Sequence, residues 1–364
     1  MNDTTGENCP PLSHQPKMVV LDPDGDLSFL VGQNQPNASW GLKAEGPIIF
    51  VVCSRTVSRA SPVWKTLLYG GFAESKRPIT SNSSEWLVEL PEDNPKAMST
   101  ILNIIHSRFE NLPRISDSIS LVDLYQLTVL TDKYDLTTVL RPWATSWMHS
   151  LHDSNDYWAN FLLPGANLRR HLWIAWELGD LDHLRKTAKE MILTHTGNIS
   201  QSKPGDITFN LTSHILDIPG LEDMVREERL RGIDSLLKPF KDLIDRLLQK
   251  PDTPGHKTVC SVPVNYYGSA KHCDAAMLGV VIRSLSWAGL WPIPEASLFL
   301  GSMRDLATIL KSLDTGSCFP SHSCQPLPDR NAQIDKQISA FEVQLAESQL
   351  RHIENQAKKS GLSL

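Results

Sequence analysis

The chain has 364 residues, more than one hydrophobic core usually holds, so two or three domains are expected. Its 41% hydrophobic and 21% charged residues are typical of a globular protein, and its net charge of −6 excludes a global positive field that would gather nucleic-acid phosphates. No apolar run approaches the roughly 20 residues that cross a bilayer, and residues 1–17 lack the pattern of a signal peptide. We therefore expect an intracellular protein, cytoplasmic or nuclear, that binds neither nucleic acid nor membrane.

The sequence pattern of the N-terminal part of the chain predicts a small sheet. Residues 1–17 are polar and are expected to be disordered, with order beginning at Val19. Strands are predicted at residues 27–31, 48–53 and 86–90, which are rich in β-branched or aromatic residues and are bounded by turn signals. The first two strands should form a hairpin with a long connection.

Helices follow these strands. Residues 54–72 predict two short helices, the second beginning at Pro62, and Asn94 should cap a third helix. Ser120 with Asp123 indicates a capping box for a helix over residues 121–134, and Pro142 predicts a break near Arg141. We therefore expect an α+β domain over residues 18–150, with helices packed against a small sheet.

Beyond residue 150 only helices are predicted. Residues 151–250 should contain an antiparallel helix pair with its turn at Gly179 and a long helix that Pro239 should kink. Residues 251–330 predict a small helical module, in which Ser302 with Asp305 should open a helix. Residues 331–364 predict a single charged C-terminal helix. The apolar stripe of that last helix is too short for a coiled coil.

Four blocks of sequence in a fixed order carry a resemblance. They are Asp22-Pro23-Asp24-Gly25-Asp26-Leu27, Ser54–Trp64, Leu68–Ser75, and Leu124–Tyr134 followed by Leu140-Arg141-Pro142-Trp143. Together they resemble a BTB/POZ domain over residues 18–150, and the last block is similar to the BTB proteins of filamentous fungi. The segments Gly289-Leu290-Trp291-Pro292 and His322-Ser323-Cys324 look like the tails of those proteins.

The resemblance implies a protein-interaction module that self-associates, recruits a partner such as the cullin scaffold of a ubiquitin ligase, or does both. Phe72-Ala73-Glu74 matches the hydrophobic-x-Glu motif through which some family members bind a cullin. In the alternative interpretation, Phe72 caps the core and Glu74 is simply solvated.

Asp26 and Arg55 match the charged pair near the symmetric interface of BTB dimers, which implies a homodimer. The match is partial, because Ser54 stands where the family usually has a histidine at the start of the helix. Asp26 could also merely begin a strand.

Six cysteines spread over this length do not form a disulfide framework, and in a reducing compartment they are thiols or metal ligands. Thiols and imidazoles of the C-terminal third could together hold a structural zinc ion. The predicted ligands are Cys260, Cys273, Cys318, His322 and Cys324. No CxxC pair supports the site, so free thiols and surface histidines are the alternative. Cys53, in an apolar run, is interpreted as a buried small hydrophobe.

The sequence contains none of the common catalytic motifs, neither HExxH, GxSxG, a phosphate-binding GxxxxGK[ST] nor GxGxxG between a strand and a helix. We therefore expect no enzymatic activity and no cofactor other than zinc. A zinc hydrolase with Glu295 beside the metal is the alternative of a different class, and a scaffold for transcriptional co-regulators is another. Trp143, Trp147, Trp173 and Trp176 fall on helical stripes and predict core packing rather than a ligand pocket.

Overall fold

A computed structural model describes residues 16–34, 46–75, 86–114, 117–153, 166–197, 218–250, 257–260, 270–315 and 324–363. The chain is of mixed α/β class, with a small sheet and many helices, and it divides into two compact units. The first, here the N-terminal unit, comprises Met1–Tyr157, Trp173–Asp180 and Arg351–Leu364. The second, here the helical unit, comprises Trp158–Leu172 and Leu181–Leu350.

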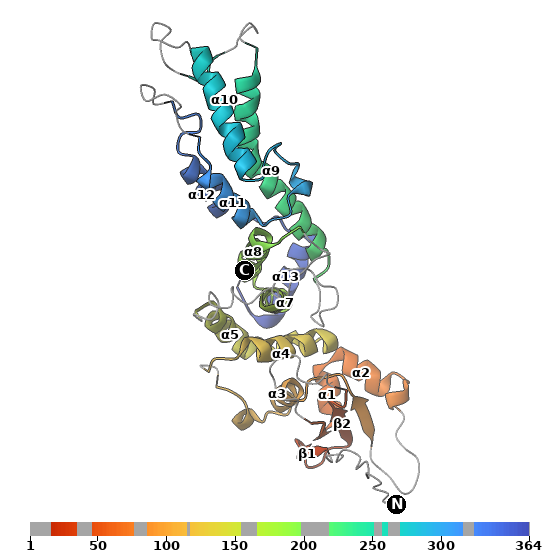
Figure 1. The fold of residues 1–364 in the computed structure, drawn as a ribbon. Coiled ribbons are helices and arrows are strands. Elements are labelled where there is room, and N and C mark those ends of the chain that lie inside the picture. The colour runs from red at the N-terminus through yellow and green to blue at the C-terminus, as the bar shows by residue number, and fades with distance from the viewer. Residues whose placement is uncertain are drawn as a thin grey trace, which may run out of the picture. The chain divides into compact units, whose positions relative to one another are not determined.

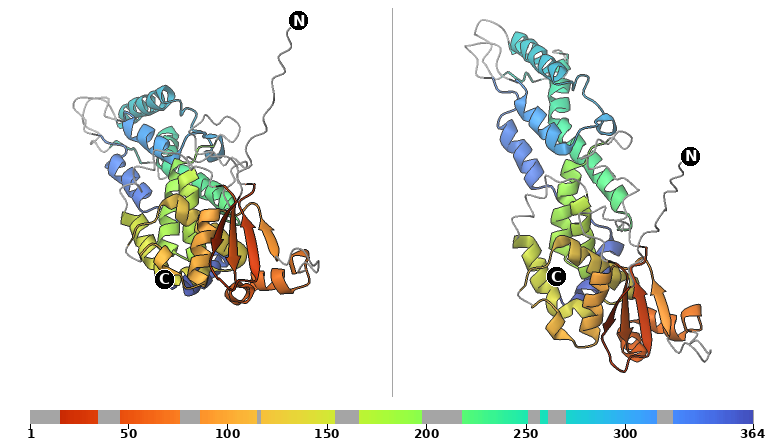
Figure 2. Two further views of the ribbon diagram at one scale, coloured as in Figure 1. Left: turned by 90° about the horizontal axis from the view of Figure 1, so that it is seen from below. Right: turned by 60° about the horizontal axis from the view of Figure 1, so that its bottom comes forward.

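The sheet has four strands in the order β1-β3-β2-β4. Figures 1 and 2 show it in red to orange colours. The bounds of the strands are Lys17–Val20 for β1, Leu27–Val31 for β2, Ile48–Val52 for β3 and Leu87–Leu90 for β4. Strand β2 pairs with β3 in antiparallel register, whereas β1 pairs with β3 and β2 with β4 in parallel. The predicted hairpin of residues 27–31 and 48–53 is therefore confirmed.

Strand β1 was not predicted. It begins at Lys17, before the expected start of order, while residues 1–15 lie outside the described part of the chain. Met18 is 56% exposed and Val20 45% exposed, so the strand lacks the in-and-out alternation that identifies a half-buried strand in a sequence. Its pairing with β3 defines it, and that long-range pairing leaves no local pattern.

The helices of the N-terminal unit begin largely as predicted. Ser61, Asn94 and Ser120 each cap a helix, because their side chains accept hydrogen bonds from the backbone N–H three residues later, at 3.0, 2.9 and 3.1 Å. A 3₁₀ turn ends at Leu140 and the next helix begins at Arg141, which is the predicted restart before Pro142. The helices are α1 (Ser54–Ala60), α2 (Pro62–Tyr69), α3 (Pro95–Ile105), α4 (Leu121–Tyr134) and α5 (Arg141–Asp153).

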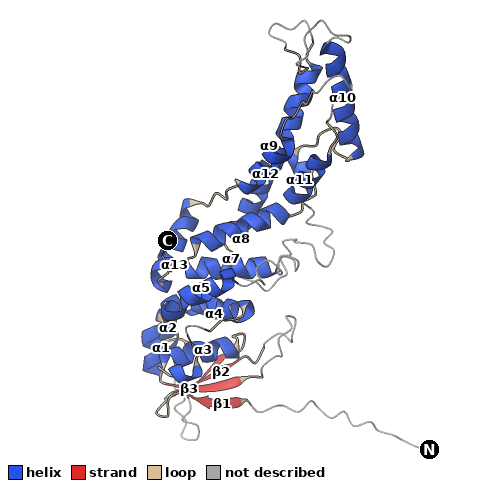
Figure 3. Cartoon of the chain, turned by 90° about the vertical axis from the view of Figure 1, so that its left-hand side faces the viewer, coloured by secondary structure: helices blue, strands red, loops and turns tan. Residues whose placement is uncertain are grey.

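Helices α1, α2 and α3 lie on the same side of the strands (Figure 3). The core between them is centred on Trp64, which is fully buried. Its ring centroid lies 5.6 Å from that of Phe29 on β2 and 4.8 Å from that of Tyr134 on α4. The tryptophans that were predicted to pack in the core, namely Trp143, Trp147, Trp173 and Trp176, are all buried.

The helical unit contains α8 (Leu181–Thr194), α9 (Leu221–Leu248), α10 (Ala270–Trp287), α11 (Met303–Ser312) and α12 (Arg330–Ser339). The capping box of Ser302 and Asp305 opens α11 as predicted, and Pro239 lies inside α9. Helices α7 (Ala166–Leu178) and α13 (Glu347–Ser360) each contribute residues to both units. Among the described residues, no helix combines the length and the apolar character that a membrane span requires.

The prediction of one C-terminal helix over residues 331–364 was wrong. Helix α12 ends at Ser339 and α13 begins at Glu347. Tertiary contacts hold the non-helical connection, since the Arg231 guanidinium lies 5.5 Å from the Phe341 ring centroid and donates to the Glu342 carbonyl at 3.2 Å. Both contacts are made by Arg231 of α9, about 110 residues earlier, so the local helical pattern did not reveal them.

The limits of the two compact units also differ from the domain boundaries predicted at residues 150, 250 and 330. Residues 173–180 and 351–364 join the N-terminal unit rather than separate C-terminal parts. The Ser360 hydroxyl donates to the Leu178 carbonyl at 2.6 Å, which links two segments that lie far apart in sequence. The boundaries were predicted from breaks along the chain, and such breaks do not show which distant helices pack together.

Candidate functional site

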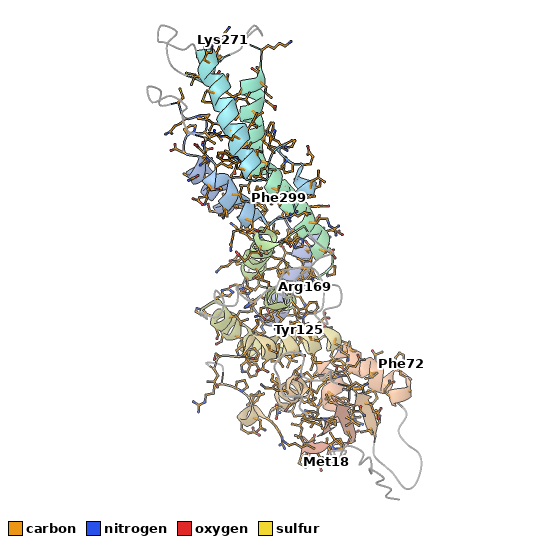
Figure 4. The ribbon with its side chains drawn as sticks, in the orientation of Figure 1. Met18, Phe72, Tyr125, Arg169, Lys271 and Phe299 are labelled. Carbon is orange, nitrogen blue, oxygen red and sulfur yellow. The ribbon has the colours of Figure 1, made fainter. Side chains whose placement is uncertain are left out.

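The predicted anchor Phe72 lies just beyond the end of α2, where Figure 4 labels it. The chain turns at Gly70-Gly71, and Gly71 has a φ of 85°, a conformation that glycine adopts without strain. Phe72 is 54% exposed. Its ring therefore does not cap the core, and it is accessible to a partner.

The backbone of residues 72–75 is held by hydrogen bonds. A 3₁₀ turn spans Ala73–Ser75, and the Ser75 hydroxyl and amide donate to the Phe72 carbonyl at 2.6 and 3.1 Å. The indole N–H of buried Trp86 donates to the Glu74 carbonyl at 2.6 Å. Phe72 and the partly exposed Glu74 are thus presented from a fixed turn, which reduces the entropy that a partner must overcome to bind them.

Asp26 stabilises the start of α1. Its two carboxylate oxygens accept hydrogen bonds from the Ser54 amide and hydroxyl, each at 2.8 Å, and the Ser54 hydroxyl also lies 2.6 Å from the Tyr69 hydroxyl. A carboxylate at a helix N-terminus is favourable for the helix dipole. Asp26 therefore has a structural role in the single chain, while Arg55 is exposed on α1. The dimer interface that the resemblance implies for this pair stays a prediction.

Three of the five predicted metal ligands come together in the helical unit. The sulfur atoms of Cys260, Cys273 and Cys324 all lie within 4.8 Å of one another, and those of Cys260 and Cys324 are 3.4 Å apart. All three residues are buried, and none forms a disulfide. The other two predicted ligands, Cys318 and His322, lie outside the described residues.

Helix α10 and a short loop position this cysteine cluster. Cys273 lies in the first turn of α10, two residues after Lys271, which is labelled in Figure 4. The carboxylate of Asp274 accepts hydrogen bonds from the amides of Val259 at 3.1 Å and Cys260 at 2.8 Å. Burial raises the pKa of the Cys273 thiol to about 12, with further contributions from the neighbouring thiols.

The geometry does not favour a zinc hydrolase. Glu295 is exposed and is not among the groups whose ligand atoms converge on the three sulfurs. A catalytic zinc needs an accessible position for water and substrate, whereas the three cysteines are each at most 6% exposed.

Cys53 is only partly buried, so its interpretation as a buried small hydrophobe was wrong. It follows the end of β3 and precedes α1, rather than lying within the strand.

A third feature, in the N-terminal unit, was missed by the sequence analysis. Glu177 on α7 is fully buried, and its carboxylate accepts three hydrogen bonds. The hydroxyls of Thr131 and Thr137 donate to one oxygen at 3.0 and 2.6 Å, and the Gln356 amide donates to the other at 2.6 Å. This carboxylate cluster joins α4, the 3₁₀ turn after it, α7 and α13.

Burial dominates the electrostatics of Glu177 and raises the pKa of its carboxyl to about 7, against the effect of the Thr137 hydrogen bond. A polar cavity of about 500 Å³ adjoins it, lined also by Asp132, Asp135, His352 and Lys359. Burial also raises the pKa of Asp132 and lowers that of His352. The one sequence signal was a glutamate inside the apolar run 172–178, where a buried acid needs hydrogen-bonding partners.

Comparison with known proteins does not identify this chain. No model of a known protein family matches it, and no curated protein matches its sequence. The surface formed by Phe72 and Glu74, the cysteine cluster and the carboxylate cluster of Glu177 are thus the features from which a function can be inferred.

Proposed function

We propose that this protein is a protein-interaction module of the BTB/POZ kind, and that it recruits a partner protein through Phe72 and Glu74. The observation that carries the proposal is the exposed ring of Phe72 on a turn that Trp86 holds in place. A large exposed aromatic side chain on a fixed backbone is the type of residue that dominates binding energy at protein interfaces.

The two side chains have complementary roles in this proposal. Burying the exposed part of an aromatic ring in a partner pocket contributes about 1.5–3 kcal/mol. The Glu74 carboxylate fixes orientation by pairing with a donor or a basic side chain of the partner. Because the net charge of the chain is −6, a partner surface with basic residues is favoured electrostatically.

The resemblance of residues 72–74 to a cullin-binding motif makes the N-terminal region of a cullin the first partner to test. The affinity of the full-length chain for this purified region should be measured by isothermal titration calorimetry. We expect Phe72→Ala to weaken binding by about 30-fold, which corresponds to the 2 kcal/mol of an interface anchor. We expect Glu74→Ala to weaken binding as well.

Phe109→Ala is the matched control, because Phe109 is 58% exposed in the same unit but belongs to a different 3₁₀ turn. Both Phe variants should keep the wild-type unfolding free energy within about 1 kcal/mol, as expected for surface positions. If wild-type protein fails to bind the cullin, the cullin proposal is wrong. If Phe72→Ala and Phe109→Ala bind equally well, the anchor proposal is wrong.

Self-association is a second interaction that one observation favours. Met18 and Val20 are exposed apolar residues on β1, the strand at one end of the sheet order, and edge strands readily pair with another chain. Light scattering should therefore find a dimer of the full-length protein, which Met18→Lys with Val20→Lys should convert to a monomer. A wild-type protein that stays monomeric at concentrations of order 100 μM, well above a μM dissociation constant, would contradict self-association.

A further inference from the structure

The buried cysteine cluster of the helical unit differs from an ordinary apolar core. Cys260, Cys273 and Cys324 come from three parts of the chain: a short loop, the first turn of α10, and the stretch just before α12. Their sulfurs converge within a cluster that also contains Met277 and against which Leu247 packs. Three polarizable, ionisable groups thus face one point from independent parts of the chain.

The distances fit a metal site. A zinc–sulfur bond of about 2.3 Å places the sulfurs of a tetrahedral site about 3.8 Å apart. The three sulfurs here lie within 4.8 Å of one another, with one pair at 3.4 Å. That pair is well beyond the roughly 2.05 Å of a disulfide bond.

The surroundings also suit bound thiolates. Cys273 lies in the first turn of α10, an 18-residue helix whose N-terminal partial positive charge stabilises a thiolate. Asp274 holds the loop that carries Cys260 through two backbone amides, so this ligand is fixed before any metal binds. Such outer contacts orient metal ligands and increase affinity.

We propose that Cys260, Cys273 and Cys324 bind one thiophilic divalent cation, with zinc as the best-fitting ion, in a structural site of the helical unit. Each thiol transfers its proton to solvent as its sulfur binds the metal, and no oxidant or reductant is involved. The three sulfurs occupy three tetrahedral positions, and a further ligand takes the fourth. The metal would connect the loop that carries Cys260, helix α10 and the stretch of chain before α12.

Metal analysis of the full-length protein tests this proposal. The protein should be purified without a histidine tag under reducing conditions, supplied with zinc, and freed of excess metal by a weak chelator. We expect about one zinc per chain. Cobalt(II) in place of zinc should give the visible absorption of a tetrahedral thiolate complex.

Cys273→Ser and Cys324→Ser should each reduce bound zinc at least tenfold and abolish the cobalt–thiolate absorption. Cys53→Ser is the control that should retain both, because Cys53 belongs to the N-terminal unit and the cluster belongs to the helical unit. If the serine variants do not fold, a strong chelator should lower the melting temperature of the wild-type protein, and added zinc should restore it.

Several results would overturn the metal site. Wild-type protein that retains no zinc after this treatment and shows no cobalt–thiolate absorption would do so, as would Cys324→Ser binding as much zinc as wild type. A Cys260–Cys324 disulfide in a second preparation made without reductant and without added metal, seen by mass spectrometry as the loss of two hydrogen atoms, would show that the close sulfurs are a redox pair instead.

Discussion

At the scale of single residues, the buried acid Glu177 makes the stability of the N-terminal unit depend on pH. Its folded-state pKa of about 7 lies above the ordinary value of about 4.3, so the folded protein retains this proton where the unfolded chain has lost it. The resulting stabilisation is fully present below about pH 4 and is lost as the pH rises through 7. The pKa difference corresponds to about 3–4 kcal/mol.

Glu177→Gln should remove this dependence. A glutamine can still accept hydrogen bonds from Thr131 and Thr137, and Gln356 can turn its amide to accept from the new side-chain amide. We expect the variant to be more stable than wild type at pH 8, by about 1–3 kcal/mol, with a flatter stability profile between pH 5 and 8. Urea unfolding of both proteins at several pH values measures these free energies of unfolding.

The control for this comparison is Glu89→Gln, at an exposed position of β4 in the same unit, which should leave the profile unchanged. A Glu177→Gln protein that is less stable than wild type by the same amount at every pH would contradict the assignment. In that case the ionised form of Glu177, rather than its protonated form, would stabilise the folded protein.

At this scale the sequence showed contiguous motifs and helical stripes, but not which distant side chains meet. The motif around Phe72 is contiguous, so its candidate role could be recognised in the chain, but whether its ring is exposed was left open until the structure showed it. The cysteine cluster was predicted from residue type alone, and only folding shows that three of the sulfurs meet. The partners of Glu177 include Gln356, 179 residues later, and no local pattern indicates such a contact.

At the scale of elements, the turn between α7 and α8 depends on a glycine. Gly179 has a φ of 80°, and a Cβ atom there would lie 2.1 Å from the backbone nitrogen of Ala357 on α13. Gly179→Ala should therefore destabilise the N-terminal unit by about 2–5 kcal/mol, from backbone strain of about 1–2 kcal/mol and overpacking of about 1–3 kcal/mol. Thermal and urea unfolding measure this loss of stability.

Gly71→Ala is a matched comparison in the same unit. Gly71 has nearly the same φ, 85°, but a Cβ atom there would have no neighbour within 4 Å. This variant should show the strain alone, about 1–2 kcal/mol. Equal effects of the two substitutions would mean that α13 does not pack against the α7–α8 turn as closely as described.

The elements themselves were predictable where local chemistry defines them. Ser61, Asn94, Ser120 and Ser302 start helices through their own side chains, and all four starts were recognised in the sequence. Strand β1 and the connection between α12 and α13 depend instead on distant partners, β3 and Arg231. The sequence analysis therefore missed β1 and predicted a continuous helix where the chain breaks between α12 and α13.

At the scale of the whole molecule, the N-terminal unit includes residues from the far end of the chain. Ile353 and Ala357 of α13 are fully buried, and Gln356 and Ser360 bond to Glu177 and the Leu178 carbonyl. Removing residues 351–364 should therefore destabilise this unit by at least about 3 kcal/mol, because apolar contacts are lost and a buried acid loses a partner.

The truncated chain tests whether residues 351–364 stabilise the N-terminal unit although they lie far from it in sequence. Gln356→Ala, which removes one hydrogen bond and keeps the helix, should have a smaller effect than the truncation. If the truncated protein melts at the wild-type temperature, residues 351–364 do not contribute to the N-terminal unit.

The central claim is that Phe72 contacts a partner protein, and site-specific photo-crosslinking tests it most directly. A photoreactive phenylalanine analogue placed at position 72 of the full-length chain in cells should form a covalent adduct with a defined partner, identified by mass spectrometry. The same analogue at the equally exposed position 109 should not, and Glu74→Ala should weaken the adduct at position 72. No adduct at position 72, or the same adducts from positions 72 and 109, would contradict the claim.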